Sequence, residues 1–301
     1  MAIREAWSSQ LRHTITTLVT IEGIGAHSGA QARVTLKPLH QPKGVLLNGL
    51  SLTEWTRRAR WATLLSSPSQ ARMVSTPEHL LATLYGAGVD DLEIEVLSLS
   101  GEEPLELPMF DGSAWPWLSL ICPTPTAEGA YERRWRQLPS LELTRGRDQL
   151  SCSAQAAPQA QGPLSAALTL SLSALFPELV HEAILEEERA WLEASQRAEL
   201  LSADDFVTLI APARTFGLRR HEPQLRAQGL IRGVTEQSCL ILDDFGRAHQ
   251  PLRHPHELAA HKLLDFLGDL ALSGERWRGH IELWRGSHAL NHALLDSLKG
   301  R

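Results

Sequence analysis

A short segment rich in Pro, Thr and Gly, residues 122–129 (CPTPTAEG), most constrains what this chain can fold into. It separates two long stretches that each mix strand-like and helix-like patterns, and its composition is typical of a linker. A chain of 301 residues, 43% of them hydrophobic, is long enough to form two ordinary domains. We therefore predict two domains, each combining sheet and helix, with the boundary in this segment.

The first half opens with two β-type runs, residues 14–22 and 31–37, joined by the glycine-rich loop GIGAHSGA at 23–30. The glycines run G-x-G-x-x-x-G and a strand follows them, so the loop is not a dinucleotide-binding fingerprint. It is either an ordinary hairpin turn or a loop whose backbone and His27 approach a ligand. We also predict a helix over 75–85 and a half-exposed strand over 92–96.

The second half begins with β-like runs, and its charged segment 180–201 alternates in sign at three- and four-residue steps, which favours an exposed amphipathic helix. A long helix is predicted over 257–272 and ends at Ser273-Gly274. The other predicted elements are strands at 140–144, 166–172, 238–242 and 280–284, a short helix between Pro223 and Gly229, and a terminal helix after 285–287. No internal repeat is visible in the sequence.

The composition excludes several classes of protein. A net charge of -6 provides no general attraction to nucleic acid. Arginines gather at 131–136 and at Arg214, Arg219 and Arg220, where they either hold one small anion or form a solvated face. Three widely spaced cysteines give no disulfide framework, and we find neither a signal peptide nor a membrane span. We expect a cytoplasmic monomer for which peripheral membrane contact stays open.

The helix at 257–272 carries the first candidate for chemistry. His261 and Asp265 are spaced i, i+4, which places their side chains on one face within about 6 Å at Cβ, and Asp269 continues the row. An ordinary ion pair gives the same pattern. H-x-x-x-D also supplies two zinc ligands, and a catalytic zinc site adds a distant third ligand while it leaves a position for water. His79 is the candidate third ligand.

Two further residues have more than one interpretation. In Ser75-Thr76-Pro77-Glu78 the S-x-x-E spacing is that of a capping box, in which Glu78 reaches back to the Ser75 amide. An acid directly before a metal-binding histidine is equally suited to remove a proton from water as a general base. His288 lies where a strand ends and a helix begins, and it is either a turn residue or a proton donor to a leaving group.

Six motifs together resemble the UDP-3-O-acyl-N-acetylglucosamine deacetylases of lipid A biosynthesis, in order and over almost the whole chain. They are GIGAHSG (23–29), STPEHLLATL (75–84), PMFDGSA (108–114), ARTFG (213–217), AHKLLDFLGDL (260–270) and RGSHALN (285–291). The resemblance implies two similar α+β domains, each a sheet layered on helices with a small insert, and an active site between them. These are residues 1–126, with the Glu78-His79 helix and a short insert, and 127–301, with the His261–Asp265 helix and an insert at about 217–242.

The resemblance also implies roles for individual residues. Zinc, or iron(II), which suits the same ligands, would be bound by His79, His261 and Asp265. Glu78 would be the general base, His288 the general acid oriented by Asp269, and Thr215 a donor to the oxyanion. Lys262 would provide a positive charge to the nucleotide-sugar or the site, Phe216 would pack on substrate, and His27 and Gly233 would complete the substrate site.

The implied reaction is hydrolysis of the N-acetyl group of UDP-3-O-acyl-N-acetylglucosamine, which is the expected partner molecule. Departures from the family pattern at Ala26, Pro77, His221, Val234 and Ser287 leave two alternatives. One is a diverged deacetylase that acts on another N-acetylated sugar or nucleotide-sugar. The other is a zinc-binding relative without catalysis, although such a protein has no need of Glu78 or His288. A serine hydrolase is disfavoured because no G-x-S-x-G elbow is present.

Overall fold

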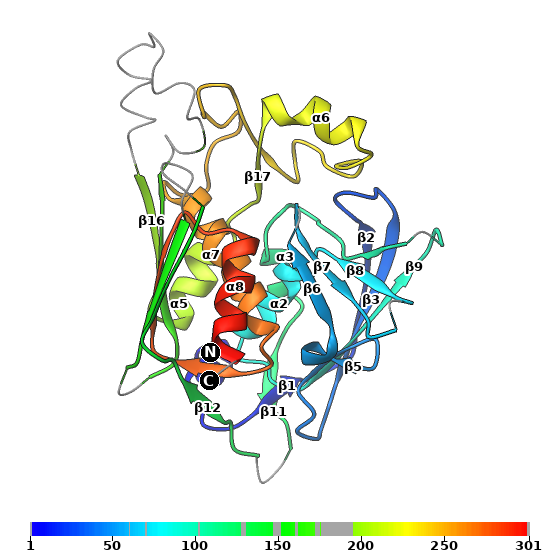
Figure 1. Cartoon of the computed structure of the whole chain (residues 1–301). Helices are drawn as coiled ribbons and strands as arrows, with labels where there is room; N and C mark the ends of the chain where they lie inside the picture. Colours follow the sequence, from blue (N-terminus) through cyan, green and yellow to red (C-terminus); the bar gives the residue numbers. More distant parts are fainter. Residues whose placement is uncertain are drawn as a thin grey trace.

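Two five-stranded sheets, one from each half of the chain, lie on either side of a group of helices (Figure 1). The computed structural model describes residues 2–59, 61–69, 71–101, 103–127, 131–146, 152–159, 162–171, 175 and 195–299. The first sheet has the order β2 (Val19–Ile24), β3 (Gln31–Pro38), β9 (Leu92–Ser98), β4 (Val45–Leu47) and β5 (Leu50–Ser51). The second has the order β13 (Leu141–Arg145), β14 (Cys152–Ala157), β20 (His280–Trp284), β15 (Ser165–Ser171) and β16 (Ser195–Leu200).

Both sheets have the same topology. Each consists of two antiparallel hairpins, β2-β3 with β4-β5 and β13-β14 with β15-β16, and a later strand lies between the hairpins. That strand, β9 or β20, runs antiparallel to the strand on one side and parallel to the strand on the other. The predicted α+β class with two similar halves is therefore confirmed, whereas the boundary between residues 126 and 127 stays a prediction.

The helices occupy equivalent places in the two halves. α2 (Glu78–Gly86) precedes β9 and α3 (Trp115–Leu118) follows it; α7 (Glu257–Ala271) precedes β20 and α8 (His288–Lys299) follows it. Every residue of α2 is buried, and so is nearly all of α7, so neither helix has a solvated face. The apolar core runs without a break through both halves. Within the described ranges, the other helical segments are α1 (Ala2–Ser8), η1 (Leu52–Glu54), α5 (Ala203–Asp205), η5 (Phe206–Ile210), η6 (Arg219–His221) and α6 (Glu222–Ala227).

The described residues also form smaller sheets. β10 (Leu105–Glu106), β8 (Met73–Ser75), β7 (Thr63–Ser66) and β6 (Thr56–Ala59) form a four-stranded sheet. Three pairs are β1 (His13–Ile15) with β11 (Pro123–Pro125), β12 (Trp135–Gln137) with β19 (Arg276–Arg278), and β17 (Phe216–Leu218) with β18 (Leu240–Leu242). None of the helices in the described ranges combines the length and apolar character needed to cross a membrane.

Three predictions of local structure need correction. The charged segment 180–201 was predicted to be helical, but its last part is strand β16, in which Gln196, Ala198 and Leu200 are buried and the residues between them are exposed; residues 180–194 lie outside the described residues. The run 14–22 is broken into β1 and β2. Part of the predicted linker is strand β11, so it is tied to the first half rather than free.

The arginine cluster at 131–136 belongs in part to the protein interior. Arg133 is buried, pairs with Asp90 at 2.7 Å and donates to backbone carbonyls of residues 6, 7, 9 and 88. Arg276 binds the same carboxylate at 2.9 Å. Because Asp90 lies in the first half and both arginines in the second, this part of the cluster connects the halves. Neither alternative from the sequence, an anion site or a solvated face, describes Arg133.

Candidate metal centre and its pocket

The candidate site forms where α2 and α7 pack directly against each other. A side-chain carbon at Gly268 would lie only 2.1 Å from the Glu78 carbonyl oxygen, so the absence of a side chain there permits this close approach. α2 begins after its N-cap residue Pro77, at which no side-chain capping hydrogen bond forms within the described residues. The capping-box interpretation of Ser75 and Glu78 is therefore wrong: Ser75 ends strand β8, and Glu78 lines the pocket.

His79, His261 and Asp265 come together as predicted. Their ligand atoms lie within 4.8 Å of one another, and all three residues are buried. The Asp265 Oδ1 atom is 3.4 Å from His261 Nε2 and 3.9 Å from His79 Nε2. His261 Nδ1 lies 3.0 Å from the Ala213 carbonyl, which can only accept a hydrogen bond. That bond fixes the proton on Nδ1 and leaves the lone pair of Nε2 available to bind a metal ion.

The surroundings favour the protonation states that ligate a metal. Burial, with the neighbouring His261, lowers the pKa of His79 to about 3, and burial also lowers the pKa of His261. Burial alone would raise the pKa of Asp265, but Lys262 and the nearby histidines hold it below its ordinary value. Neutral imidazoles beside an ionised carboxylate are the forms that bind a divalent cation. The donor set therefore fits zinc or iron(II).

Glu78 lies beside this cluster with one carboxylate oxygen unpaired. Its Oε2 atom is buried and has no hydrogen-bond partner among the described residues, and its Oε1 atom is 3.9 Å from His288 Nε2. Burial raises the pKa of Glu78 to about 8. A buried acid with a free oxygen and a pKa near neutrality has the properties of a general base or acid.

His288 is in hydrogen-bond contact with Asp269. Its Nδ1 atom lies 2.7 Å from Asp269 Oδ2, and the same oxygen accepts from Asn291 at 2.9 Å. The other carboxylate oxygen accepts from Thr63 at 2.5 Å and lies 3.3 Å from His292 Nε2. Burial alone would lower the pKa of His288, but Asp269, Asp265 and Glu78 together raise it to about 10. The imidazole therefore carries a proton at Nε2, on the side of Glu78 and Asp265.

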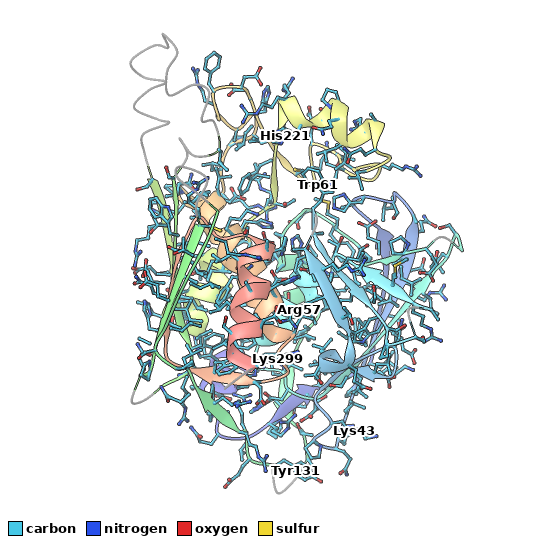
Figure 2. The ribbon with its side chains drawn as sticks, in the orientation of Figure 1. Lys43, Arg57, Trp61, Tyr131, His221 and Lys299 are labelled. Atoms are coloured by element: carbon cyan, nitrogen blue, oxygen red, sulfur yellow. The ribbon has the colours of Figure 1, made fainter. Side chains whose placement is uncertain are left out.

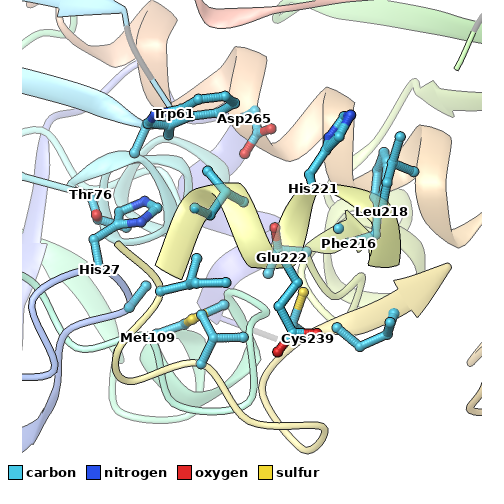
Figure 3. A pocket seen from close by; sticks show the side chains of 18 of the residues that line it. His27, Trp61, Thr76, Met109, Phe216, Leu218, His221, Glu222, Cys239 and Asp265 are labelled. Carbon is cyan, nitrogen blue, oxygen red and sulfur yellow. The ribbon is translucent and has the colours of Figure 1, made fainter. Parts of the chain in front are cut away.

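A pocket of about 710 Å³ opens over these residues. Figure 3 shows His27 and Thr76 on one side of it and Phe216 and Leu218 on the other. His221 and Trp61, which also line the pocket, lie near α6 at the upper end of the molecule in Figure 2. Besides Glu78, His79, Asp265 and His288, the predicted residues that line the pocket are His27, Thr215, Phe216 and Lys262. The apolar part of its wall includes Ala26, Met109, Leu218, Leu225, Ile231, Val234, Cys239 and Ile241.

The glycine-rich loop is both a hairpin turn and part of this wall. It joins β2 to β3, and a buried carboxylate, Glu106, accepts hydrogen bonds from the amides of His27 and Ser28 at 2.8 and 2.7 Å. The ring atom Nδ1 of His27 is buried, and no residue in the described part of the chain forms a hydrogen bond with it. Gly233 is not among the residues that line the pocket. A side chain there would meet the Gly25 carbonyl at 2.1 Å, so this glycine lets two loops touch.

Lys262 and Phe216 occupy neighbouring positions on one wall. The Lys262 ammonium lies 3.0 Å from Asp265 Oδ2 and 5.4 Å from the centre of the Phe216 ring, within cation–π range. The Phe216 ring also meets the His261 ring edge-on at 6.5 Å. The positive charge of Lys262 therefore lies beside the Asp265 carboxylate and at the wall of the pocket.

Several residues that build the site have no role in the sequence prediction. Asn291 and His292 lie one helical turn after His288, and their i+3 and i+4 spacing was the available signal. No local sequence signal pointed to Thr63 or to the Ala213 carbonyl, because long-range packing brings them to the site. The same is true of Glu106.

The site combines a cluster of two histidines and an aspartate with the carboxylate of Glu78 and the Asp269-bound His288, all at one pocket. This combination is typical of a metal-dependent hydrolase. The family model described as LpxC: UDP-3-O-acyl N-acetylglycosamine deacetylase matches residues 12–300. The chain belongs to this family, and it is a hydrolytic deacetylase; the resemblance predicted from the six motifs is confirmed.

Curated relatives agree along nearly the full chain. A UDP-3-O-acyl-N-acetylglucosamine deacetylase of Synechocystis is 34% identical over 295 residues, which cover 95% of this chain and 98% of the relative. The proteins of the same name from Anaeromyxobacter and Idiomarina loihiensis are 32% and 28% identical and cover 94% and 95% of this chain and 87% and 89% of the relatives. The similarity therefore extends over both halves and every segment that forms the site.

Proposed function

We propose that this chain hydrolyses the N-acetyl group of UDP-3-O-acyl-N-acetylglucosamine to acetate and UDP-3-O-acyl-glucosamine, a step of lipid A biosynthesis. One observation carries the proposal: the ligand atoms of His79, His261 and Asp265 converge within 4.8 Å at a pocket that Glu78 and His288 also line. The names of the relatives supply the substrate. The pocket joins this polar end to an apolar wall, which suits a sugar that carries an acyl chain.

His79, His261 and Asp265 would hold Zn²⁺ or Fe²⁺. When bound, such an ion polarises a carbonyl and makes a water molecule more acidic at neutral pH. The His261 ring is already fixed for this task by its hydrogen bond to the Ala213 carbonyl. The charge of Lys262 offsets part of the negative charge of Asp265, 3.0 Å away.

Glu78 and His288 then move the protons of the reaction. The free Oε2 atom of Glu78 takes a proton from the attacking water, and its ionised form is favoured by positive charge in the neighbouring cluster. His288 holds a proton at Nε2, because Asp269 binds its Nδ1–H, and gives it to the departing amine. Asp269 stays ionised and keeps the ring in place.

The walls of the pocket position the rest of the substrate. We assign the Thr215 hydroxyl as a donor to the oxygen that becomes negative when water adds to the acetamide carbonyl. Phe216 and His27 are assigned to opposite sides of the sugar, and Lys262 to a negative group of the nucleotide-sugar (Figure 3). Gly233 contributes through the loop contact with Gly25 rather than through its own atoms.

Acetate release from the purified protein tests the proposal. We expect a chelator to abolish turnover and added Zn²⁺ or Fe²⁺ to restore it. Glu78→Gln should lower kcat by at least about 100-fold, since it removes the general base. The matched control is Glu93→Gln, a partly exposed acid on β9 that does not line the pocket. If the chelated protein or Glu78→Gln releases acetate as fast as the untreated wild type, the mechanism is wrong. Turnover of other N-acetylated sugars, and not of this substrate, would contradict the substrate assignment.

A further inference from the structure

A buried carboxylate that has no assigned role lies one helical turn before His261. Glu257 is in the first turn of α7 and is fully buried. It accepts three hydrogen bonds from Arg214: from the backbone amide at 3.0 Å, from Nε at 2.8 Å and from Nη2 at 3.1 Å. A fourth comes from the Arg253 amide at 2.6 Å. Burial alone would raise the pKa of Glu257, but these partners lower it, so the carboxylate is ionised.

The arginine that Glu257 binds lies between two residues of the site. Arg214 follows Ala213, whose carbonyl accepts the His261 Nδ1 proton, and precedes Thr215, which lines the pocket. Since the carboxylate binds both the side chain and the amide of Arg214, it fixes the backbone at this point. His261 and Glu257 belong to the same helix. The contact between Glu257 and Arg214 therefore fixes the position of the Ala213 carbonyl relative to His261, which donates to it.

Other contacts hold the same loop from the opposite side. The Gly112 carbonyl accepts from the Thr215 amide at 2.8 Å, and the Ala211 carbonyl accepts from the Ala114 amide at 2.9 Å. Arg253 extends from the second half to Asp111, at 2.8 Å, and also donates to the Pro212 carbonyl at 2.6 Å. Residues 211–215 are thus held between the helix that carries a metal ligand and the turn of the first half.

We infer that Glu257, acting through Arg214, is a positioning residue that orients His261 and places Thr215. This inference rests on the proposed function. A stabilising role alone explains the contact less well, because a buried ion pair is often no more stabilising than apolar residues of the same size. Partners that orient a metal-binding histidine typically contribute 10- to 100-fold to metal affinity or activity.

The test measures zinc binding and kinetics separately in two variants. Glu257→Gln keeps the size and loses the charge, and Arg214→Lys keeps the charge and loses the planar fork that binds a carboxylate at two points. For each folded variant, metal-free protein competes with a chromophoric chelator for Zn²⁺. We expect zinc affinity to fall about 10- to 100-fold. With saturating Zn²⁺, kcat should fall more than KM rises, because Thr215 acts on the transition state.

Asp90→Asn is the matched control, because Asp90 is also a buried carboxylate that binds two arginines but does not line the pocket. It should lower stability and leave zinc affinity unchanged. If folded Glu257→Gln and Arg214→Lys bind Zn²⁺ with wild-type affinity and retain kcat, the inference is overturned. If Glu257→Gln does not fold, Arg214→Lys decides alone. A wild type that binds Zn²⁺ without turning over the sugar contradicts the proposed function, while the comparison of affinities still tests the inference.

Discussion

At the scale of single residues, the two oxygens of Asp269 serve different parts of the site. One oxygen binds His288 and Asn291, and the other binds Thr63 and lies near His292. These partners come from strand β7 and helix α8, so two separate elements fix one carboxylate. Because the carboxylate is fully buried and ionised, its charge acts on His288 with little screening by water.

Asp269→Asn should therefore change the pH dependence of the reaction. Asp269 is the main reason that the pKa of His288 is raised to about 10 despite burial. A histidine with a raised pKa stays protonated to higher pH, so removing the anion must make it lose its proton at lower pH. We expect kcat to fall by about 100-fold or more, and the alkaline fall of kcat/KM to begin at lower pH.

Rate profiles between pH 5 and 10 measure this effect. The control is Asp296→Asn: Asp296 is on α8, the helix of His288, and it pairs with Arg57 instead of His288. An alkaline limb at the wild-type pH in Asp269→Asn would show that His288 is not the acid.

At the scale of elements, the contact of α2 with α7 depends on one glycine. An alanine in place of glycine inside a helix normally stabilises it by up to about 1 kcal/mol. At Gly268 the added carbon would lie 2.1 Å from the Glu78 carbonyl oxygen, so the helices must move apart. We expect Gly268→Ala to lower the free energy of unfolding by about 1–3 kcal/mol, measured by urea denaturation. The same substitution should reduce turnover, since it displaces Glu78 from the cluster. An increase in stability would contradict the packing argument.

Elements whose signals are local were predictable from the sequence. The helix that carries H-x-x-x-D and the strand at 280–284 are where the pattern placed them, because helical spacing and alternation are properties of neighbouring residues. Segment 195–200 was not predicted correctly, because the three- and four-residue spacing of the charges around it was interpreted as helical. Arg197 in fact pairs with Glu282, two strands away in the sheet, and that partner is invisible in a local pattern.

The residues of the candidate site also differ in whether a local pattern could predict them. The candidate metal ligands, Glu78 and His288 could be named from motifs, because each motif is short and continuous. Their supports could not, because Thr63, the Ala213 carbonyl and Glu257 reach the site through long-range packing. The S-x-x-E motif misled for a related reason: Glu78 turns into the pocket, and no side chain caps α2.

At the scale of the whole molecule, Asp90 connects the halves far from the pocket. It binds Arg133 and Arg276 of the second half and the His13 amide of the first. Burial alone would raise the pKa of Asp90, but Arg276 and Arg133 lower it. A carboxyl with a lowered pKa stabilises the fold above its unfolded pKa of about 3.9 and loses that contribution as the pH falls through its folded pKa.

We therefore expect Asp90→Asn to lower the free energy of unfolding by about 3–5 kcal/mol at pH 7, because it leaves Arg133 buried without its anion. Urea denaturation of wild type and variant at pH 7 and at pH 3 checks the sign. The difference in stability between wild type and variant should narrow at pH 3, because the Asp90 carboxyl of the unfolded wild type is then largely protonated and the native pairing contributes less. A gap of the same size at both pH values would contradict an electrostatic role for Asp90.

The shared topology of the two sheets has a further consequence for how the molecule can be taken apart. His79 belongs to one repeat, and His261 and Asp265 belong to the other, on helices in equivalent places. Cleavage of the chain near residue 127 would give two polypeptides. Neither would contain all three proposed metal ligands, or both the proposed base Glu78 and the proposed acid His288. Recovery of catalysis on mixing them would then report directly that the two pieces had reunited in their native arrangement.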